Sequence, residues 1–160
     1  MRWVRRLVVL LLVVFGVGSL ATWPRQSPRG GAPLLAGAQI DPPVRAALER
    51  ACRDCHSEAT RYAWYSYVAP VSWLIRSDVV RGREHLNLSL WSEYPLVRRE
   101  RSLSEIANQV IDREMPLAMY TWLHRDARLS DTEVDAIFRW TQAERRRLIQ
   151  DSTRQRSEEH

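Results

Sequence analysis

The chain has 160 residues, 45% of them hydrophobic, and its 24 basic and 19 acidic side chains give a net charge of +5 at pH 7. This length suits one domain with a tail or an anchor and leaves little room for two domains. The whole excess of charge lies in residues 1–37, which contain five arginines and no acid, whereas residues 38–160 contain 19 of each. An electrically balanced folded part excludes the broad basic surface of a nucleic-acid-binding domain, so we expect no nucleic-acid partner.

The first 23 residues are expected to form a membrane anchor or a signal peptide. The 21 residues from Trp3 to Trp23 would make a helix of about 31 Å, enough to cross a hydrocarbon core of ~30 Å. The two tryptophans and the preceding arginines favour a retained anchor with a cytoplasmic N-terminus. A cleaved signal peptide is the alternative, because Ser19 and Ala21 match the small residues of a cleavage site. Residues 24–39 are rich in proline and glycine and predict a flexible tether.

Glycine and asparagine are scarce in the rest of the chain. After residue 37 the only glycine is Gly82, and the only asparagines are Asn87 and Asn108. Folds rich in β-strands need many tight turns, which draw on these two residue types. We therefore expect an all-α domain over residues 40–150, followed by a polar, frayed tail over residues 151–160.

Helix-start signals and apolar periodicity predict four helices in this domain. Asp41 followed by two prolines begins the first, and its apolar positions place Cys52 and Cys55 on one face. The second begins at Pro70 and ends near Gly82. A capping box at 102–105 begins the third helix, and Pro116 stops it. A second capping box at 130–133 begins the last helix. The predicted inward faces are Val71, Leu74, Ile75 and Val79, then Leu103, Ile106, Ala107, Val110 and Ile111, then Val134, Ile137, Phe138 and Thr141.

The segment Cys52-Arg53-Asp54-Cys55-His56 matches C-x-x-C-H, the attachment signature of c-type haem. Cysteines three residues apart on one helical turn lie on the same side and can reach the two vinyl groups of one porphyrin. His56, from the same turn, can reach the iron as the proximal ligand. One motif indicates one covalently attached haem c. This attachment takes place on the outer side of the bacterial membrane, so we expect a periplasmic domain, either tethered to the inner membrane or, if the N-terminal segment is cleaved, secreted.

Three other interpretations of the two cysteines stay open. A structural disulfide would need neither the histidine nor the helix. A thioredoxin-like redox pair would need a βαβ context, which the surrounding pattern does not show. A zinc site could take His85 or His124 as a fourth ligand, although zinc sites usually present a second closely spaced pair of ligands.

The sixth iron ligand must come from elsewhere in the chain. Met115 is the first candidate, because Pro116 stiffens the backbone beside it and the 59 residues after His56 suffice to reach the opposite face of a haem. Met119, one turn further on, is the methionine alternative, and His85 and His124 are the histidine alternatives. An open or water-bound site is also possible, and a methionine at a helix end is more commonly a packing residue.

Beyond the haem motif, the chain contains an ordered set of short segments and single residues that is found in a known family. They are Thr60–Tyr62, Trp64–Ser66, Ala69–Trp73, Gly82–Asn87, Ser89–Trp91, Met115–Leu117, Tyr120, His124, Ala127–Ser130, Glu133 and Trp140. With these residues the chain resembles, from about Ala51 to Trp140, the haem-binding domain family of small, membrane-anchored monohaem c-type proteins. The resemblance implies a cytochrome c-like helical pouch, with His56 and Met115 as the axial ligands. Members of the family usually have a proline before the Trp-Tyr pair, where this chain has Ala63.

The leading functional hypothesis is transfer of single electrons by a membrane-tethered cytochrome whose redox partners the sequence does not name. No general base, nucleophile or oxyanion site stands out, so an enzyme is the less favoured class. A haem-based sensor with a displaceable or open sixth site is the main alternative, and a peroxidase-like enzyme a weaker one. Arg61, Arg76 and Arg83 are candidates for pairing with haem propionates, although such arginines are more often ordinary surface residues.

Overall fold

The computed structural model describes residues 1–21 and 33–158, and in these ranges the chain forms α-helices and short 3-10 helices and no β-strand. The expected all-α class is confirmed. The elements in order are α1 (Arg2–Ala21), α2 (Pro42–Ala51), α3 (Arg53–His56), η1 (Trp64–Tyr67), α4 (Val71–His85), η2 (Leu88–Glu93), α5 (Leu96–Ile111), α6 (Ala118–Leu123), η3 (Arg125–Ala127) and α7 (Asp131–Glu158), where η denotes a 3-10 helix.

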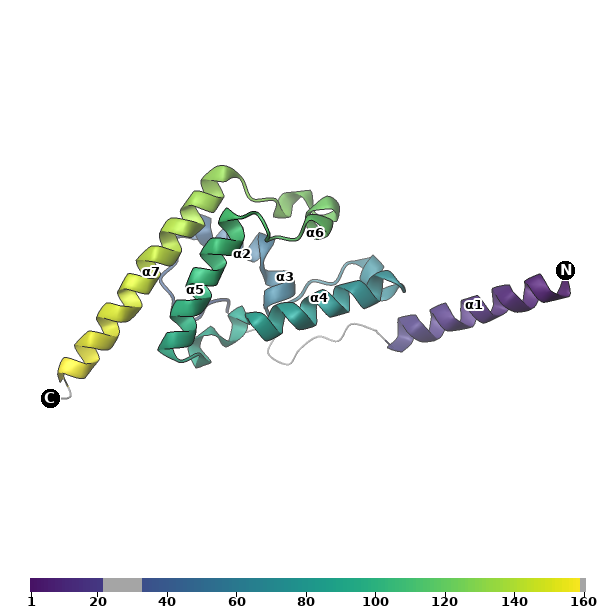
Figure 1. Ribbon diagram of the computed structural model, residues 1–160, viewed down its shortest axis with the longest axis horizontal. Coiled ribbons are helices and arrows are strands. Elements are labelled where there is room, and N and C mark those ends of the chain that lie inside the picture. Colours follow the sequence, from purple (N-terminus) through teal and green to yellow (C-terminus); the bar gives the residue numbers. More distant parts are fainter. Residues whose placement is uncertain (22–32, 159–160) are drawn as a thin grey trace.

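The core of the domain is built around α5 and α7, which lie side by side and antiparallel (Figure 1). Helix α2 packs against α7, and α3 packs against α4. Apolar residues recur every three or four positions on the facing sides of these helices, and burying that stripe is what holds such helices together. Leu103 of α5 and Ile137 of α7 are fully buried, as is Trp91 of η2.

Two of the predicted helix starts are confirmed. Asp41 is the N-cap residue of α2, with prolines in the first two helical positions. At the start of α7, the Ser130 amide donates to Glu133 Oε2 at 2.9 Å, and the Glu133 amide donates to the Ser130 hydroxyl at 3.3 Å. This reciprocal pair is a capping box.

The predicted start of α5 is wrong. The helix begins at Leu96, after Pro95, so the 102–105 pattern lies inside it and Ser102 is buried. Nothing between Leu96 and Ser102 breaks a helix, and the leucine, arginine and glutamate found there favour one. At its other end α5 stops at Ile111, before Pro116 is reached.

The predicted inward faces hold in part. Of the residues expected to be buried on α4, Val79 is buried, but Val71 and Leu74 are exposed. Ile111 and Phe138 are also exposed, because each lies at the edge of its helix's buried stripe. The remaining members predicted for α5 and α7 are buried, namely Leu103, Ile106, Ala107, Val110, Val134, Ile137 and Thr141.

The second part of the segment predicted as a flexible tether packs against the domain. Residues 22–32 lie outside the described residues, but Leu34 and Leu35 are buried in the core, and the Leu35 amide donates to the carbonyl of Leu88 at 2.9 Å. The carbonyl of Gln39 accepts from the indole of Trp140 at 2.8 Å. Two leucines that can be buried outweigh the proline and glycine around them. Helix α7 continues to Glu158, through most of the tail that was expected to fray.

Helix α1 extends away from the domain, with its N-terminus at the far end (Figure 1). Its mean hydropathy is 2.1, and it is the one helix among the described residues that is long and apolar enough to cross a membrane. A signal sequence has the same properties, so this finding is compatible with both expectations for the N-terminus. Trp23, expected at its outer boundary, lies outside the described residues.

Candidate haem site

The C-x-x-C-H motif lies where α2 ends and α3 begins. The predicted single helix is broken at Cys52, whose φ of −116° departs from helical values. The amide of Cys52 still donates to the carbonyl of Leu48, and the amide of His56 donates to the carbonyl of Cys52, both at 2.9 Å. Cys52 and Cys55 are therefore one helical turn apart. Both are free thiols and both are partly buried.

The His56 imidazole is fixed by α4. Its Nδ1 lies 3.0 Å from the carbonyl oxygen of Gly82 and 3.1 Å from that of Leu86. Both partners are acceptors, so Nδ1 must carry the proton, and Nε2 has the lone pair that a metal ion requires. Burial lowers the pKa of His56, although the two carbonyl contacts oppose that shift. The imidazole is therefore neutral at neutral pH and holds the tautomer of an iron ligand.

Gly82 allows α4 to approach the motif closely. A Cβ atom at this position would lie 2.7 Å from the carbonyl oxygen of Cys55 and 3.2 Å from its carbonyl carbon. Only a glycine fits at this crossing, because the opposing atoms are backbone atoms that cannot rotate away. The only glycine after residue 37 is thus a close-packing residue in the last part of α4.

The environment of the two thiols keeps them protonated. Burial raises the pKa of Cys52 to about 12, and the charge of Cys55 adds to this effect. The pKa of Cys55 rises to about 11, chiefly through burial and then through the carboxylates of Asp78 and Asp54. Reactive redox cysteines need the thiolate form, which this environment disfavours. The thioredoxin-like interpretation therefore gains no support.

Asp54, inside the motif, connects it to α6. One carboxylate oxygen accepts from the Tyr120 hydroxyl at 2.8 Å, and the other accepts from the amide of Arg61 at 3.1 Å and from its guanidinium at 3.2 Å. Burial, and then the Asp54 charge, raise the pKa of Tyr120, so its hydroxyl remains a donor at physiological pH. The segment that contains α6 is thereby held against the motif.

His124 is fully engaged by its neighbours. Its Nε2 lies 2.8 Å from the Tyr65 hydroxyl, and its Nδ1 lies 3.2 Å from the carbonyl oxygen of Tyr120. Its ring also stacks on that of Tyr120, with the centroids 4.2 Å apart. With both ring nitrogens occupied, His124 is a poor candidate for an iron or zinc ligand.

The other candidate ligands are less constrained. Met115 is partly buried in the segment between α5 and α6, and its amide donates to the carbonyl of Gln109 at 3.1 Å. Met119 on α6 is 70% exposed, and His85 at the end of α4 is also exposed. Partial burial next to a segment held by the motif favours Met115, and its role as a ligand stays a prediction.

The three candidate propionate arginines have protein partners. Arg83 donates to the Ser57 carbonyl at 2.8 Å and to the Thr60 hydroxyl at 2.9 Å, so it braces the loop that follows the motif. Arg61 pairs with Asp54, but its side chain is 57% exposed. Arg76 lies 3.4 Å from the carbonyl oxygen of Ala21 at the end of α1.

The residues present fit a covalently attached haem better than a zinc ion. Within residues 1–21 and 33–158, no three or more His, Cys, Asp or Glu side chains are grouped so that they could hold a metal ion. A porphyrin supplies four nitrogen ligands of its own, so its iron needs only one protein nitrogen and one further group. His56 Nε2 can supply that nitrogen, and the two free thiols on the same turn are suited to thioether attachment of the porphyrin.

The motif predicted its own three reactive groups, but not the residues that support them. The carbonyls of Gly82 and Leu86 act through backbone atoms and have no side-chain signature. Asp54 lies at a variable position of C-x-x-C-H, and its partner Tyr120 is 66 residues away. One signal was available, because a lone glycine in a long helical region often marks a close approach of two backbones.

Comparison with known proteins agrees with these features. The family model described as Haem-binding domain matches residues 13–143, which include the end of α1, the motif, α4 and α6. No curated protein and no solved structure matches the chain. The matched range covers most of the chain and all of the residues that surround His56, and the chain belongs to the haem-binding domain family.

Proposed function

We propose that this haem-binding protein attaches one haem c covalently through Cys52 and Cys55, and that it carries single electrons at the outer face of the bacterial inner membrane. The observation that carries the proposal is the state of His56. Its Nδ1 proton is shared by two carbonyl oxygens of the α4 region, and its Nε2 is left for the iron, on the same helical turn as two protonated free thiols.

When bound, the haem supplies an iron that cycles between its ferric and ferrous states. The protein's part is to hold and tune that iron. The Nδ1 contacts fix the orientation of the proximal imidazole and raise its basicity. We assign Met115 as the sixth ligand, since the Tyr120–Asp54 hydrogen bond holds the neighbouring helix α6 against the motif. Ligation by methionine gives a higher reduction potential than ligation by two histidines.

Helix α1 is proposed to anchor the protein, with the N-terminus in the cytoplasm and the domain in the periplasm. Its apolar length and the three arginines among its first six residues support this topology. An anchored domain meets membrane redox partners at a high effective concentration, so a tight docking surface is not required.

Two measurements test the proposal. Haem staining after denaturing electrophoresis should show haem on the wild-type chain and none on a Cys52→Ser/Cys55→Ser variant. The ferric protein should show a sulfur-to-iron charge-transfer absorption band that Met115→Ala abolishes and Met119→Ala, the matched control, retains. Haem lost on denaturation would refute covalent attachment. A wild-type protein without the band whose ferrous form binds carbon monoxide rapidly would refute Met115 ligation and support the sensor alternative.

A further inference from the structure

The C-terminal end of α1 is attached to the domain at one place. The amide of Ala69 donates to the Ser19 hydroxyl at 3.1 Å. The indole nitrogen of Trp73 lies 3.4 Å from the Gly18 carbonyl oxygen, and its ring packs against Gly18 so closely that a Cβ there would lie 2.7 Å from it. With the contact between Arg76 and Ala21, these interactions join the last turn of α1 to the start of α4.

This attachment fixes how deep the start of α4 lies in a membrane. A helix of 20 residues is about 30 Å long, the thickness of the hydrocarbon core. Gly18 and Ser19 lie only about 3–5 Å inside its C-terminal end, which places them at the outer boundary of that core. A side chain that contacts them, such as Trp73, must lie at the same level. Figure 1 shows η1 and the start of α4 as the part of the domain nearest to α1.

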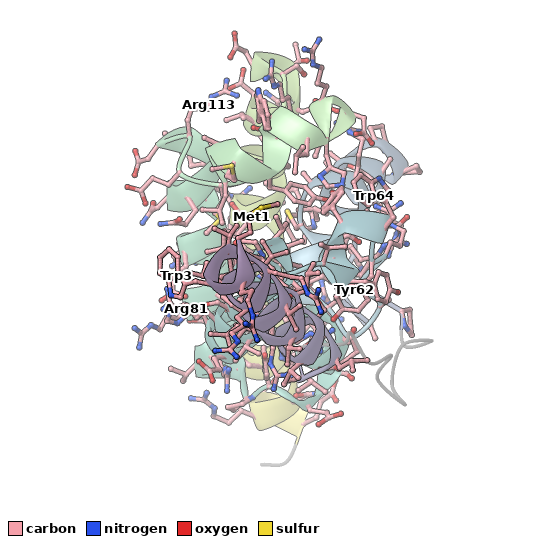
Figure 2. The ribbon with its side chains drawn as sticks, turned by 90° about the vertical axis from the view of Figure 1, so that its right-hand side faces the viewer. Met1, Trp3, Tyr62, Trp64, Arg81 and Arg113 are labelled. Carbon is pink, nitrogen blue, oxygen red and sulfur yellow. The ribbon has the colours of Figure 1, made fainter. Side chains whose placement is uncertain are left out.

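Five exposed apolar side chains lie in this part of the chain. We call them the anchor-side patch: Trp64 (79% exposed), Val68 (50%), Val71 (37%), Trp73 (44%) and Leu74 (62%). Figure 2 looks at the domain from the α1 side, with Met1 in front, and shows Trp64 and Tyr62 beside the helix on the face turned to the viewer. A soluble domain in water would gain nothing by exposing so many apolar groups together.

The sequence around the anchor-side patch has the composition of a membrane interface. Residues 61–77 contain no acidic residue, two arginines and five aromatic residues, two of which are tryptophans. Tryptophan and tyrosine concentrate at the level of lipid headgroups, and arginine is attracted to anionic phospholipids. This acid-free segment lies beside the C-terminal end of α1, so its composition is suited to contact with lipid there.

We propose that the anchor-side patch inserts into the outer interface of the bilayer that holds α1, so that the domain rests on the membrane in one orientation instead of moving freely on a tether. This inference depends on the proposed anchoring role of α1. Trp73 and its apolar neighbours lie among the headgroups and the first carbons of the acyl chains, and Arg76 lies at the level of the phosphates.

The test uses the full-length, haem-loaded protein in lipid nanodiscs of phosphatidylglycerol and phosphatidylethanolamine that contain a photoactivatable diazirine phospholipid. Cleavage at arginine after illumination gives a peptide of residues 62–76 from the patch, a control peptide of residues 102–113 from α5, and a peptide of residues 7–25 from the anchor. We expect lipid adducts on the patch peptide to exceed those on the control peptide by about fivefold or more, because aromatic and basic side chains of the patch lie at the level of the headgroups. Trp73→Ala should lower this labelling, whereas Trp122→Ala, an exposed tryptophan on α6, should not.

Three other outcomes would overturn the inference. Labelling of the anchor peptide with equal labelling of the patch and control peptides would mean that the domain does not rest on lipid. A patch peptide that is unlabelled only when haem is present would mean that the porphyrin covers these side chains. If Trp73→Ala left the labelling of the patch peptide undiminished, with unchanged absorption and circular dichroism spectra, insertion of the anchor-side patch into the bilayer through Trp73 would be excluded. Absence of lipid from the anchor peptide itself would instead refute the proposed anchoring role of α1.

Discussion

Replacing Gly82 by alanine tests the closest contact at the site. The added Cβ would lie 2.7 Å from the Cys55 carbonyl oxygen, so α4 would have to retreat until this distance reaches at least 3.4 Å, an ordinary contact. The carbonyl oxygens of Gly82 and Leu86, now 3.0 and 3.1 Å from His56 Nδ1, would then move beyond hydrogen-bonding distance.

The expected loss of stability follows from three contributions. Overpacking costs about 1–3 kcal/mol, the weakened His56 contact costs roughly 1 kcal/mol, and the better helix propensity of alanine returns about 1 kcal/mol. The net loss is therefore about 2 kcal/mol, or roughly 8 °C in Tm for a domain of this size. Weaker support of the proximal imidazole should also raise the reduction potential of the haem.

The assay is thermal and guanidinium unfolding of the full-length protein in detergent, followed by circular dichroism, together with a redox titration. Ser77→Ala, on the same helix but away from Cys55, controls for helix propensity and should change neither quantity appreciably. If Gly82→Ala were as stable as the wild type, with the same potential, α4 would not be in tight contact with the motif and the reasoning would fail.

Three further predictions concern the framework around the site. Glu133→Gln should cost about 1 kcal/mol at pH 7. Burial opposes ionisation, but hydrogen bonds from its N-cap and from Arg50 hold the pKa of Glu133 below its ordinary value. The difference in stability from wild type should therefore be fully present at neutral pH and disappear as pH falls through that lowered pKa. Arg147→Met should cost about 3 kcal/mol in urea unfolding, because it removes the cation that pairs with the buried carboxylate of Glu144, and adding Glu144→Gln should recover much of that loss. Tyr120→Phe should speed amide exchange in α6 about fivefold by removing a hydrogen bond worth roughly 1 kcal/mol, and unchanged exchange would show that other contacts hold α6.

Much of the helical framework could be predicted because it depends on local rules. The buried stripe of α5 and the capping box of α7 each follow from residues within one or two turns of each other. The start of α5 was misplaced because the pattern at 102–105 satisfies the capping rule in sequence, although Ser102 lies buried inside the helix. A local capping signal was present, but the residues before it also favour a helix and extend α5 back to Leu96.

The segment before α2 could not be predicted for the opposite reason. Its proline and glycine content is typical of a linker, yet Leu35 bonds to the backbone of Leu88 and Gln39 accepts from Trp140. Both partners come from helices that lie far along the chain, and only the assembled core shows that there is room for these residues. The proline and glycine content of a segment predicts that it is a linker, but it does not predict whether the leucines of that segment find a place in the core.

Helix α4 connects the contact with α1 to the backbone carbonyl that holds His56. Its first turn contacts the end of α1 through Trp73, and its last part provides the Gly82 carbonyl that holds His56. Trp73 and Gly82 are nine positions apart on the helix, a distance of about 14 Å along the axis. A helix of this length is stiff, so whatever fixes its first turn at the membrane also fixes the height and orientation of the His56 imidazole above it. In this arrangement the distance between the proposed iron site and the bilayer is set by α4 and not by the length of residues 22–32.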